Sequence, residues 1–184
     1  MTADQEIYRP SPDIVAAANI KSYEEMAHCA DADLAGFWAE RAQEFEWFNP
    51  WDKVLDDSNK PFYKWFVGAR TNIAYNCLDR HVKTWRRNKL ALIWEGEKGD
   101  VRTFSYHALN REVCMFANVL RSMGVKKGDR VMIYMPNTPQ FVIAFYGILR
   151  AGAIAVPTNP QYVPRELAYQ ASDSGAETIV ALTM

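Results

Sequence analysis

The last third of the sequence alternates apolar runs with helical segments, and this order limits the chain to few folds. Short apolar runs occupy residues 131–135, 153–156 and 178–182. Apolar residues follow one another within these runs, without the alternation of a half-exposed strand, which is typical of strands buried on both faces. We therefore predict an α/β fold with a β-α-β-α-β unit, in which crossover helices cover both faces of a parallel sheet.

Proline and glycine mark the two crossover helices. Thr138 is expected to cap a helix whose first residue is Pro139, because a missing N–H costs nothing at that position. This helix is expected to end at Gly152, and a second one to run from Pro164 to near Gly175.

Ligands of parallel sheets bind beyond the carboxyl ends of the strands. In this sequence Pro136-Asn137 follows the first strand and the stiff loop PTNPQYVP follows the second. The polar side chains of these loops are candidates to line a ligand cleft: Asn137, Asn159, Gln161 and Tyr162. Loops in this position often serve only to reverse the chain. The prediction that these residues bind a ligand therefore rests on their position alone.

The first half of the chain carries weaker helix signals and many aromatic residues. Residues 1–21 lack a sustained period, Ser22–Glu25 has the spacing of a capping box, and a further helix begins at Asp33. Between residues 45 and 66, rings gather among Pro, Asp and Asn. We interpret this segment as an irregular strap whose rings pack into something larger, in preference to a ring-stacking nucleotide site.

A helix, a hairpin and an amphipathic helix are expected next. The helix predicted over Asn72–Arg87 ends in basic side chains, which favours a solvated helix end over an anion site. Residues 90–94 and 101–106 read as two strands joined by a turn. An apolar stripe ending at Gly124 then predicts an amphipathic helix. The stripe consists of Leu109, Val113, Phe116, Ala117 and Leu120.

These segments predict three parts. Residues 1–21 form a flexible arm, residues 22–88 a helical and aromatic-rich extension, and residues 89–184 the incomplete beginning of an α/β domain. The last apolar strand has no successor and no Lys or Pro to protect its edge, so we expect the sheet to continue in a longer chain.

Composition excludes several classes of function. The 21 basic and 22 acidic residues leave a net charge of −1, which gives no electrostatic reason to expect a nucleic acid or an anionic membrane as partner. The longest apolar stretch, residues 141–156, contains Arg150 and falls short of the roughly 20 residues that a membrane span needs. The 3 cysteines are widely spaced, and no secretory signal is recognised. We expect a cytoplasmic protein.

Motifs that carry chemistry by themselves are not found. The sequence contains no phosphate-binding P-loop, no dinucleotide glycine fingerprint, no zinc-protease motif and no nucleophile elbow. His28, His81 and His107 lie in different predicted helices without the spacing of metal ligands. We therefore expect no catalytic residue and no metal ligand within this segment.

Longer stretches of the sequence nevertheless resemble a known family. GFWAERAQEFEWFNPWDKVLD, KWFVGARTNIAYNCLDRH and IWEGEKGDVRTFSYHALNREVCMFANVLRSMGVKKGDRVMIYMPN look like the beginning of an AMP-forming acetyl-CoA synthetase. NCLDRH and GVKKGDRVMIYMP are the most distinctive parts, and the resemblance covers about residues 22–184. It implies the first part of a larger adenylate-forming α/β domain, which is joined later in the chain to a small mobile domain.

The resemblance also implies a reaction, its cofactors and its partners. In this family a carboxylic acid reacts with ATP to give acyl-AMP and pyrophosphate, and the CoA thiolate then takes the acyl group. Mg²⁺ offsets the phosphate charge. The family's catalytic motifs do not occur in this sequence, so the segment is expected to be inactive without the remainder of its own chain. The four loop residues are candidates for a nucleotide or CoA cleft from their position beyond the strand ends, and the resemblance itself assigns no CoA contact to them.

One departure leaves the acid open. Where acetyl-CoA synthetases usually carry a Gly-Gly-Phe-Ser-Pro loop, this chain has PTNPQYVPREL, which together with SDSGAETIVAL is more similar to fatty-acyl relatives. Acetate and a longer acid both remain candidates. Two further alternatives remain, which are a free-standing module that binds a nucleotide or a partner protein and, with less support, an unrelated dinucleotide-binding domain.

Overall fold

A computed structural model describes residues 8–182 of the protein. These residues divide into two compact units, and each is described by itself. The first contains the residues up to Phe45 together with Trp51–Gly68. The second contains Glu46–Pro50 and the residues from Ala69 onward. None of the helices formed by residues 8–182 combines the length and the apolar character needed to cross a membrane.

Three helices begin the first unit, and side-chain caps fix two of their starts. They are α1 (Pro12–Ala17), α2 (Tyr23–Ala32) and α3 (Leu34–Ala42). The hydroxyl of Ser22 accepts a hydrogen bond from the N–H of Glu25 over 3.1 Å, as the capping-box spacing predicted. Asp33 caps α3 in the same way, through the N–H of Gly36.

The aromatic segment is more regular than predicted. Strands β1 (Lys53–Asp56) and β2 (Lys64–Val67) pair antiparallel as a hairpin, with Leu55 opposite Trp65. The interpretation of this segment as irregular was therefore wrong for these two strands, whereas residues 45–52 and 57–63 form no helix and no strand of a sheet. The cross-strand pairing of aromatic and aliphatic residues favours a sheet here, and the Pro and Asn residues lie outside the paired positions.

The helix predicted over residues 72–87 forms without a gap over residues 73–82, changes its hydrogen-bond pattern within that stretch and stops before residue 85. A π-helical turn, η1 (Tyr75–Asp79), is followed by one α-helical turn, α4 (Arg80–Val82), and by a 3₁₀ helix, η2 (Trp85–Asn88). The prediction of one helix is confirmed for residues 73–82 and was wrong beyond them, because the hydroxyl of Thr84 donates to the carbonyl of His81 over 2.9 Å where the helix stops. Thr84 accepts a hydrogen bond from the N–H of Arg86 and starts η2 as a separate element.

A hairpin and a long helix follow, both as predicted. Strands β3 (Leu90–Glu95) and β4 (Val101–Ser105) pair antiparallel, with Trp94 opposite Arg102. Helix α5 (Tyr106–Ser122) begins where Ser105 caps the N–H of Ala108. It ends before Gly124, whose φ of 91° places it in the left-handed region that favours glycine.

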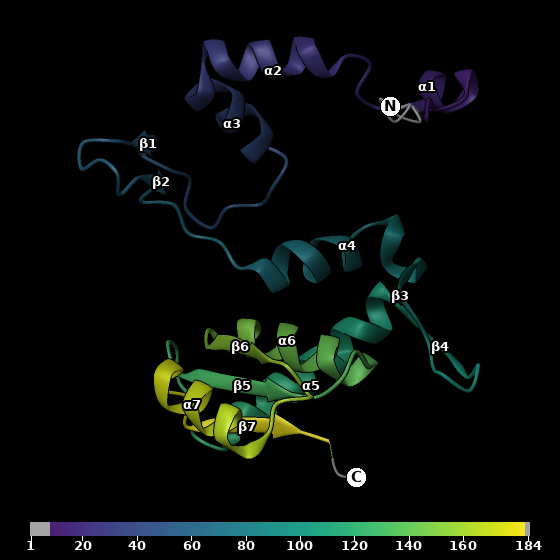
Figure 1. The fold of residues 1–184 in the computed structure, drawn as a ribbon, viewed down its shortest axis with the longest axis vertical. Helices are drawn as coiled ribbons and strands as arrows, with labels where there is room; N and C mark the ends of the chain where they lie inside the picture. The colour runs from purple at the N-terminus through teal and green to yellow at the C-terminus, as the bar shows by residue number, and fades with distance from the viewer. Residues whose placement is uncertain (1–7, 183–184) are drawn as a thin grey trace, which may run out of the picture. The chain divides into compact units, whose positions relative to one another are not determined.

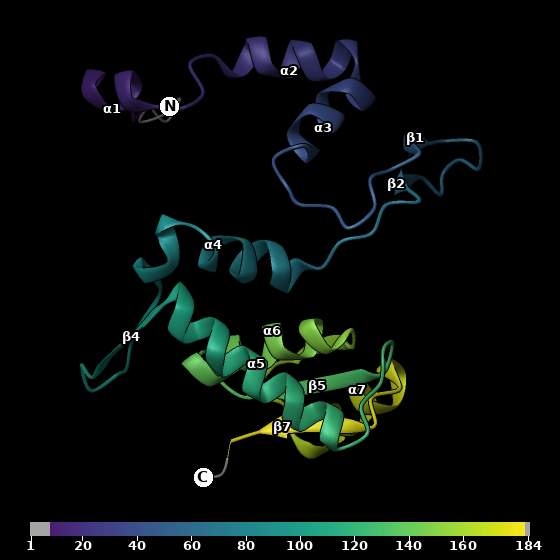
Figure 2. The same ribbon diagram turned by 180° about the vertical axis from the view of Figure 1, so that it is seen from behind.

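The parallel sheet is confirmed, and its strand order is β6-β5-β7. Strand β5 (Arg130–Tyr134) leads through α6 (Pro139–Ala151) to β6 (Ile154–Thr158) on one side. The chain then crosses back through α7 (Pro164–Ser174) to β7 (Thr178–Ala181) on the other side. Figures 1 and 2 show α7 on one face of the sheet and α5 and α6 on the opposite face.

Burial on both faces applies to the central strand alone. Val131, Met132 and Ile133 have no exposed surface, whereas β6 exposes Ile154 and Pro157, and β7 exposes every second residue. The prediction that all three strands are buried on both faces was therefore wrong for the two outer ones. An outer strand has a neighbour on one side only, and α7 covers one face alone.

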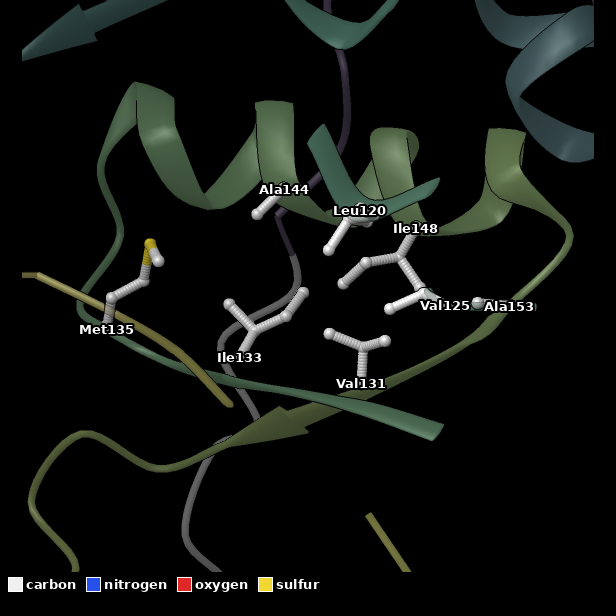
Figure 3. Packing of buried hydrophobic residues seen from close by; sticks show 8 residues of the cluster. All are labelled: Leu120, Val125, Val131, Ile133, Met135, Ala144, Ile148 and Ala153. Carbon is white, nitrogen blue, oxygen red and sulfur yellow. The ribbon is translucent and has the colours of Figure 1, made fainter. Parts of the chain in front are cut away.

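The main core lies between β5 and the α5–α6 layer. Its members are Leu120, Val125, Val131, Ile133, Met135, Ala144, Ile148 and Ala153 (Figure 3). Helices α5 and α6 approach closely at Gly147, where an added Cβ would lie 2.7 Å from Cδ1 of Phe116. The odd-numbered residues of β5 therefore face α5 and α6, and its even-numbered residues face α7.

Polar contacts at two places join residues 72–79, which include the π-helical turn, to helices α5 and α6. The guanidinium of Arg150, at the end of α6, forms an ion pair with the carboxylate of Asp79, and it also contacts Asn110 Oδ1 at 2.7 Å and Cys114 Sγ at 3.0 Å. The amide of Asn72 donates to the carbonyl of Leu149 over 2.8 Å. The distinctive NCLDRH stretch is thus explained in part by packing.

Candidate functional site

Loops leaving the carboxyl ends of β5 and β6 diverge to opposite faces of the sheet. The loop after β5 leads into α6 on one face, and the loop after β6 leads into α7 on the other. The strand order reverses at β5, which lies between β6 and β7, and doubly wound α/β sheets bind their ligands beyond the carboxyl ends of the strands at such a topological switch point. The four residues predicted from sequence all lie in these two loops.

Asn137 lies on the first loop and is exposed. Its carbonyl oxygen accepts a hydrogen bond of 2.9 Å from the indole N–H of Trp94, on the β3–β4 hairpin. Among the described residues the side-chain amide of Asn137 has no hydrogen-bond partner, so both of its polar atoms are available to a ligand.

The next residue holds the predicted capping position without making the predicted bond. Thr138 is the N-cap of α6 and Pro139 is its first residue, but the Thr138 hydroxyl makes no capping bond. Within the part of the chain that the structure describes, this buried oxygen has no hydrogen-bond partner. A buried hydroxyl without a partner carries a desolvation cost, which a ligand or a neighbouring segment would offset.

The second loop gathers the other three predicted residues into one turn. The side-chain oxygen of Asn159 accepts a hydrogen bond from the N–H of Gln161 over 3.0 Å, and its carbonyl accepts one from the N–H of Tyr162 over 3.1 Å. The hydroxyl of Tyr134 donates to the carbonyl of Tyr162 over 2.9 Å and ties the turn to β5. Asn159 therefore shapes the loop, while the side chains of Gln161 and Tyr162 extend from it.

Two cavities adjoin this turn, and Tyr162 lines both. One has a volume of about 600 Å³ on the polar side of α7, lined by Tyr162, Val163, Arg165, Glu166, Tyr169, Gln170 and Asp173. The other is about 440 Å³, and its lining is mostly apolar: Tyr134, Tyr162, Pro164, Leu167, Ala168, Ala171 and Ile179. Volumes of this size suit a small organic ligand.

Sequence reasoning missed three residues that shape this region. Trp94 and Tyr134 each hold one of the two loops, and Gln170 donates from α7 to the carbonyl of Pro157 over 3.3 Å. The position of Tyr134 could have been inferred from sequence, because it is the last residue of β5 and points to the same face as the second loop. The contacts of Trp94 and Gln170 depend on tertiary structure and have no local signal.

The described ionisable groups with shifted pKa values lie away from these loops. Burial, followed by the charges of Arg80 and Arg86, lowers the pKa of His81. Burial, followed by a hydrogen bond with Cys77, raises the pKa of Tyr146 to about 12. The two loops therefore offer hydrogen bonds, an aromatic ring and shape, which suit binding and orientation.

Two family profiles match consecutive parts of the chain. The family described as AMP-binding enzyme matches residues 78–183, and the one described as acetyl-coenzyme A synthetase N-terminus matches residues 23–77. The first profile includes both loops of the switch point. The second covers most of the helical and aromatic-rich segment.

Individual proteins show the same similarity. An acetyl-coenzyme A synthetase of Campylobacter jejuni is 44% identical over 181 residues, which cover 96% of this chain and 27% of the relative. One of Pyrobaculum arsenaticum is 45% identical over 169 residues, covering 88% of this chain and 25% of that relative. The chain thus spans about a quarter of the length of these curated relatives.

A solved structure extends the similarity to the fold. The acetoacetyl-CoA synthetase from Streptomyces lividans superposes with a TM-score of 0.81 at 27% sequence identity. The match covers 90% of this chain and 26% of that one.

Proposed function

Since this chain belongs to the family of AMP-binding enzymes, we propose that it forms the N-terminal part of an AMP-forming acyl-CoA synthetase. The observation that carries the proposal is the ordered match of two family profiles, first the acetyl-coenzyme A synthetase N-terminus and then the AMP-binding enzyme. The resemblance recognised in the sequence is thereby confirmed at the level of the family.

The proposed reaction has two steps. A carboxylate oxygen attacks the α-phosphorus of ATP, which forms acyl-AMP and releases pyrophosphate. The thiolate of CoA then attacks the acyl carbon and releases AMP. We propose acetate as the first acid to test, because the curated relatives are named acetyl-coenzyme A synthetases. A longer acid remains the alternative suggested by the loop that follows β6.

Within this reaction we propose that the switch-point loops form one wall of the nucleotide or CoA cleft. Asn137, Gln161 and Tyr162 would contact the ligand directly, since their side chains extend from the loops. Asn159 would act indirectly, because its side-chain oxygen already accepts the N–H of Gln161. These roles rest on the switch-point position and on the two adjoining cavities.

We assign no Mg²⁺ ligand and no catalytic residue to the described part of the chain. Among residues 8–182, no three His, Cys, Asp or Glu side chains come together as a metal site would require. We propose ATP, CoA and Mg²⁺ for the whole enzyme on the strength of its family. We also propose a cytoplasmic location, which suits three cysteines that are all free.

The function is tested with the full-length protein, purified and given ATP, CoA and one acid at a time. We expect AMP formation that depends on both CoA and the acid, with acetate favoured over acids of six or more carbons. AMP formation with long acids alone would overturn the choice of acetate. Failure of every acid, in a folded protein that binds ATP, would overturn the ligase assignment and favour a binding module.

The loop residues are tested in the same protein. Asn137→Ala, Gln161→Ala and Tyr162→Phe should each raise the KM for ATP or CoA, and Asn159→Ala should do so only by loosening the turn. Arg111→Ala, on the exposed side of α5, is a matched control outside the loops. Unchanged kinetic constants in all three direct variants would remove these residues from the cleft.

A further inference from the structure

We infer that Trp94 is a positioning residue for the switch-point site, acting through the backbone of Asn137. The inference rests on the proposed function, since it assigns a role within the same cleft. The two residues lie 43 positions apart in sequence and are joined by one hydrogen bond of 2.9 Å from the indole N–H to the Asn137 carbonyl. The β3–β4 hairpin thus reaches the loop that leaves the central strand.

The hairpin holds the indole in place from two sides. Arg102 lies opposite Trp94 in the ladder, and its guanidinium carbon is 5.9 Å from the ring centroid. On the turn side the ring passes close to Gly96, where an added Cβ would lie 2.8 Å from Cη2 of Trp94. Gly96 is itself fixed by its N–H, which donates to the carbonyl of Asp100 over 2.8 Å.

The loop that receives this bond has few free torsions. Its sequence is Pro136-Asn137-Thr138-Pro139, and each proline ring fixes its own φ. Thr138 is further restricted because it precedes a proline. The peptides on either side of Asn137 can still rotate, and the bond from Trp94 holds the carbonyl of the second one.

Fixing this peptide sets the direction of two polar groups at the switch point. The amide of Asn137 has no partner among the described residues, and the buried hydroxyl of Thr138 has none either. Both groups belong to residues joined by the held peptide. Without the indole bond, the backbone of Asn137 would turn between several orientations and carry its side chain with it, and a ligand would have to select one of them.

The partly buried position of Trp94 suits this role better than a general packing role. Its ring is half-buried, whereas the hydrophobic side chains packed on the cluster beneath the hairpin are Ala91, Leu92 and Phe104. The N–H can therefore be removed with small effect on folding. Loss of one neutral hydrogen bond at a loop corresponds to about a three- to tenfold change in an equilibrium.

The test replaces Trp94 by Phe in the full-length protein, which keeps an aromatic ring and removes the donor. We expect the KM for ATP, acetate or CoA to rise about three- to tenfold, with kcat and the urea midpoint nearly unchanged. Trp85→Phe is the matched control, because Trp85 is 72% exposed on η2 and away from the loop. It should leave all constants unchanged.

A double variant separates positioning from a structural effect. If Trp94 acts through Asn137, Trp94→Phe should add little to the KM of Asn137→Ala, whereas independent effects would multiply. Hydrogen exchange of residues 136–142 supplies a readout that needs no activity, and it should quicken in Trp94→Phe. Faster exchange with unchanged KM values, or multiplied effects in the double variant, would overturn the inference.

An inactive wild-type protein would overturn the proposed function, and the positioning role would fall with it. The exchange measurement distinguishes that case, since it reports the loosened loop whether or not the protein turns over substrate. Unchanged exchange in Trp94→Phe would overturn the inference even in a fully active enzyme.

Discussion

Helix α3 and the β1–β2 hairpin are rich in aromatic side chains, whereas β5 contains one tyrosine, yet β5 is the more deeply buried. Trp38 and Trp65 remain 45% and 40% exposed among the described residues, while Val131 and Ile133 have no exposed surface. The difference lies in what covers each element. Strand β5 has a strand on each side and helices on both faces. Ring content alone does not make a core.

Aromatic pairs in the first unit are consistent with this view. Trp38 meets Phe37 edge to face at 5.4 Å, and Trp51 meets Phe66 at 5.2 Å. Such pairs fix the geometry of neighbouring rings, and each adds about 0.5–1.5 kcal/mol beyond burial. Layered packing around β5 instead removes whole side chains from water, which contributes about 1.5–3 kcal/mol for each.

The largest expected effect tests the buried side of this comparison. Ile133→Ala should lower the free energy of unfolding by about 3 kcal/mol, because it leaves a cavity beneath α5 and α6. Ile179→Ala on β7 is the matched control. That side chain is 48% exposed, so its loss should cost below about 1 kcal/mol. Urea denaturation measures both, and equal losses would contradict the contrast between central and outer strands.

The second prediction concerns the ion pair that ties η1 to the α/β domain. Asp79→Ala should cost about 2 kcal/mol, because it leaves the partly buried guanidinium of Arg150 without its carboxylate. The value is below that of a fully buried pair, since the two side chains are 21% and 24% exposed. A double-mutant cycle with Arg150→Met measures the coupling, and a value near zero would show that solvent replaces the pair.

Much of the α/β region could be predicted because its signals are local. Pro139, Gly152, Pro164 and Gly175 mark helix ends to within a residue or two of the observed bounds. The buried stripe of α5 is also visible in its spacing. Strand order is different, because β6 and β7 pair with β5 through contacts that no local pattern encodes.

The predictions that failed are those that depend on contacts between residues rather than on a local sequence pattern. The stop of the 72–87 helix after residue 82 depends on a side chain that takes over a backbone group, since the hydroxyl of Thr84 donates to the carbonyl of His81 over 2.9 Å. At the site, chain order placed Asn137 and the second loop beyond strand ends. It gave no indication of Trp94, whose contact with Asn137 spans 43 residues.

The third prediction tests the exposed side of the comparison. Trp38→Ala should cost about 1 kcal/mol, which is well below the 3–5 kcal/mol of a fully buried tryptophan, because nearly half of the side chain is already in water. Urea denaturation followed by far-UV circular dichroism measures it in the 184-residue chain. A loss of 3 kcal/mol or more would mean that the ring is buried in solution.

The smallest effect concerns the pKa of His81 in α4, which lies in sequence between the aromatic-rich hairpin and the α/β region. His81 contacts the ring of Tyr106 at 4.8 Å, and its pKa lies below 6.5 because of burial and, after it, the charges of Arg80 and Arg86. A lowered pKa in the folded state means that the fold favours neutral imidazole. This contribution to stability is present above pH 6.5 and is lost as the pH falls through the folded-state pKa.

An NMR titration of His81 should show the lowered pKa, and Arg86→Gln should raise it, whereas Arg111→Gln should leave it unchanged. Because burial is the larger cause, Arg86→Gln should recover only part of the shift. Full recovery to 6.5 would show that charge alone sets this pKa and that the imidazole is open to water.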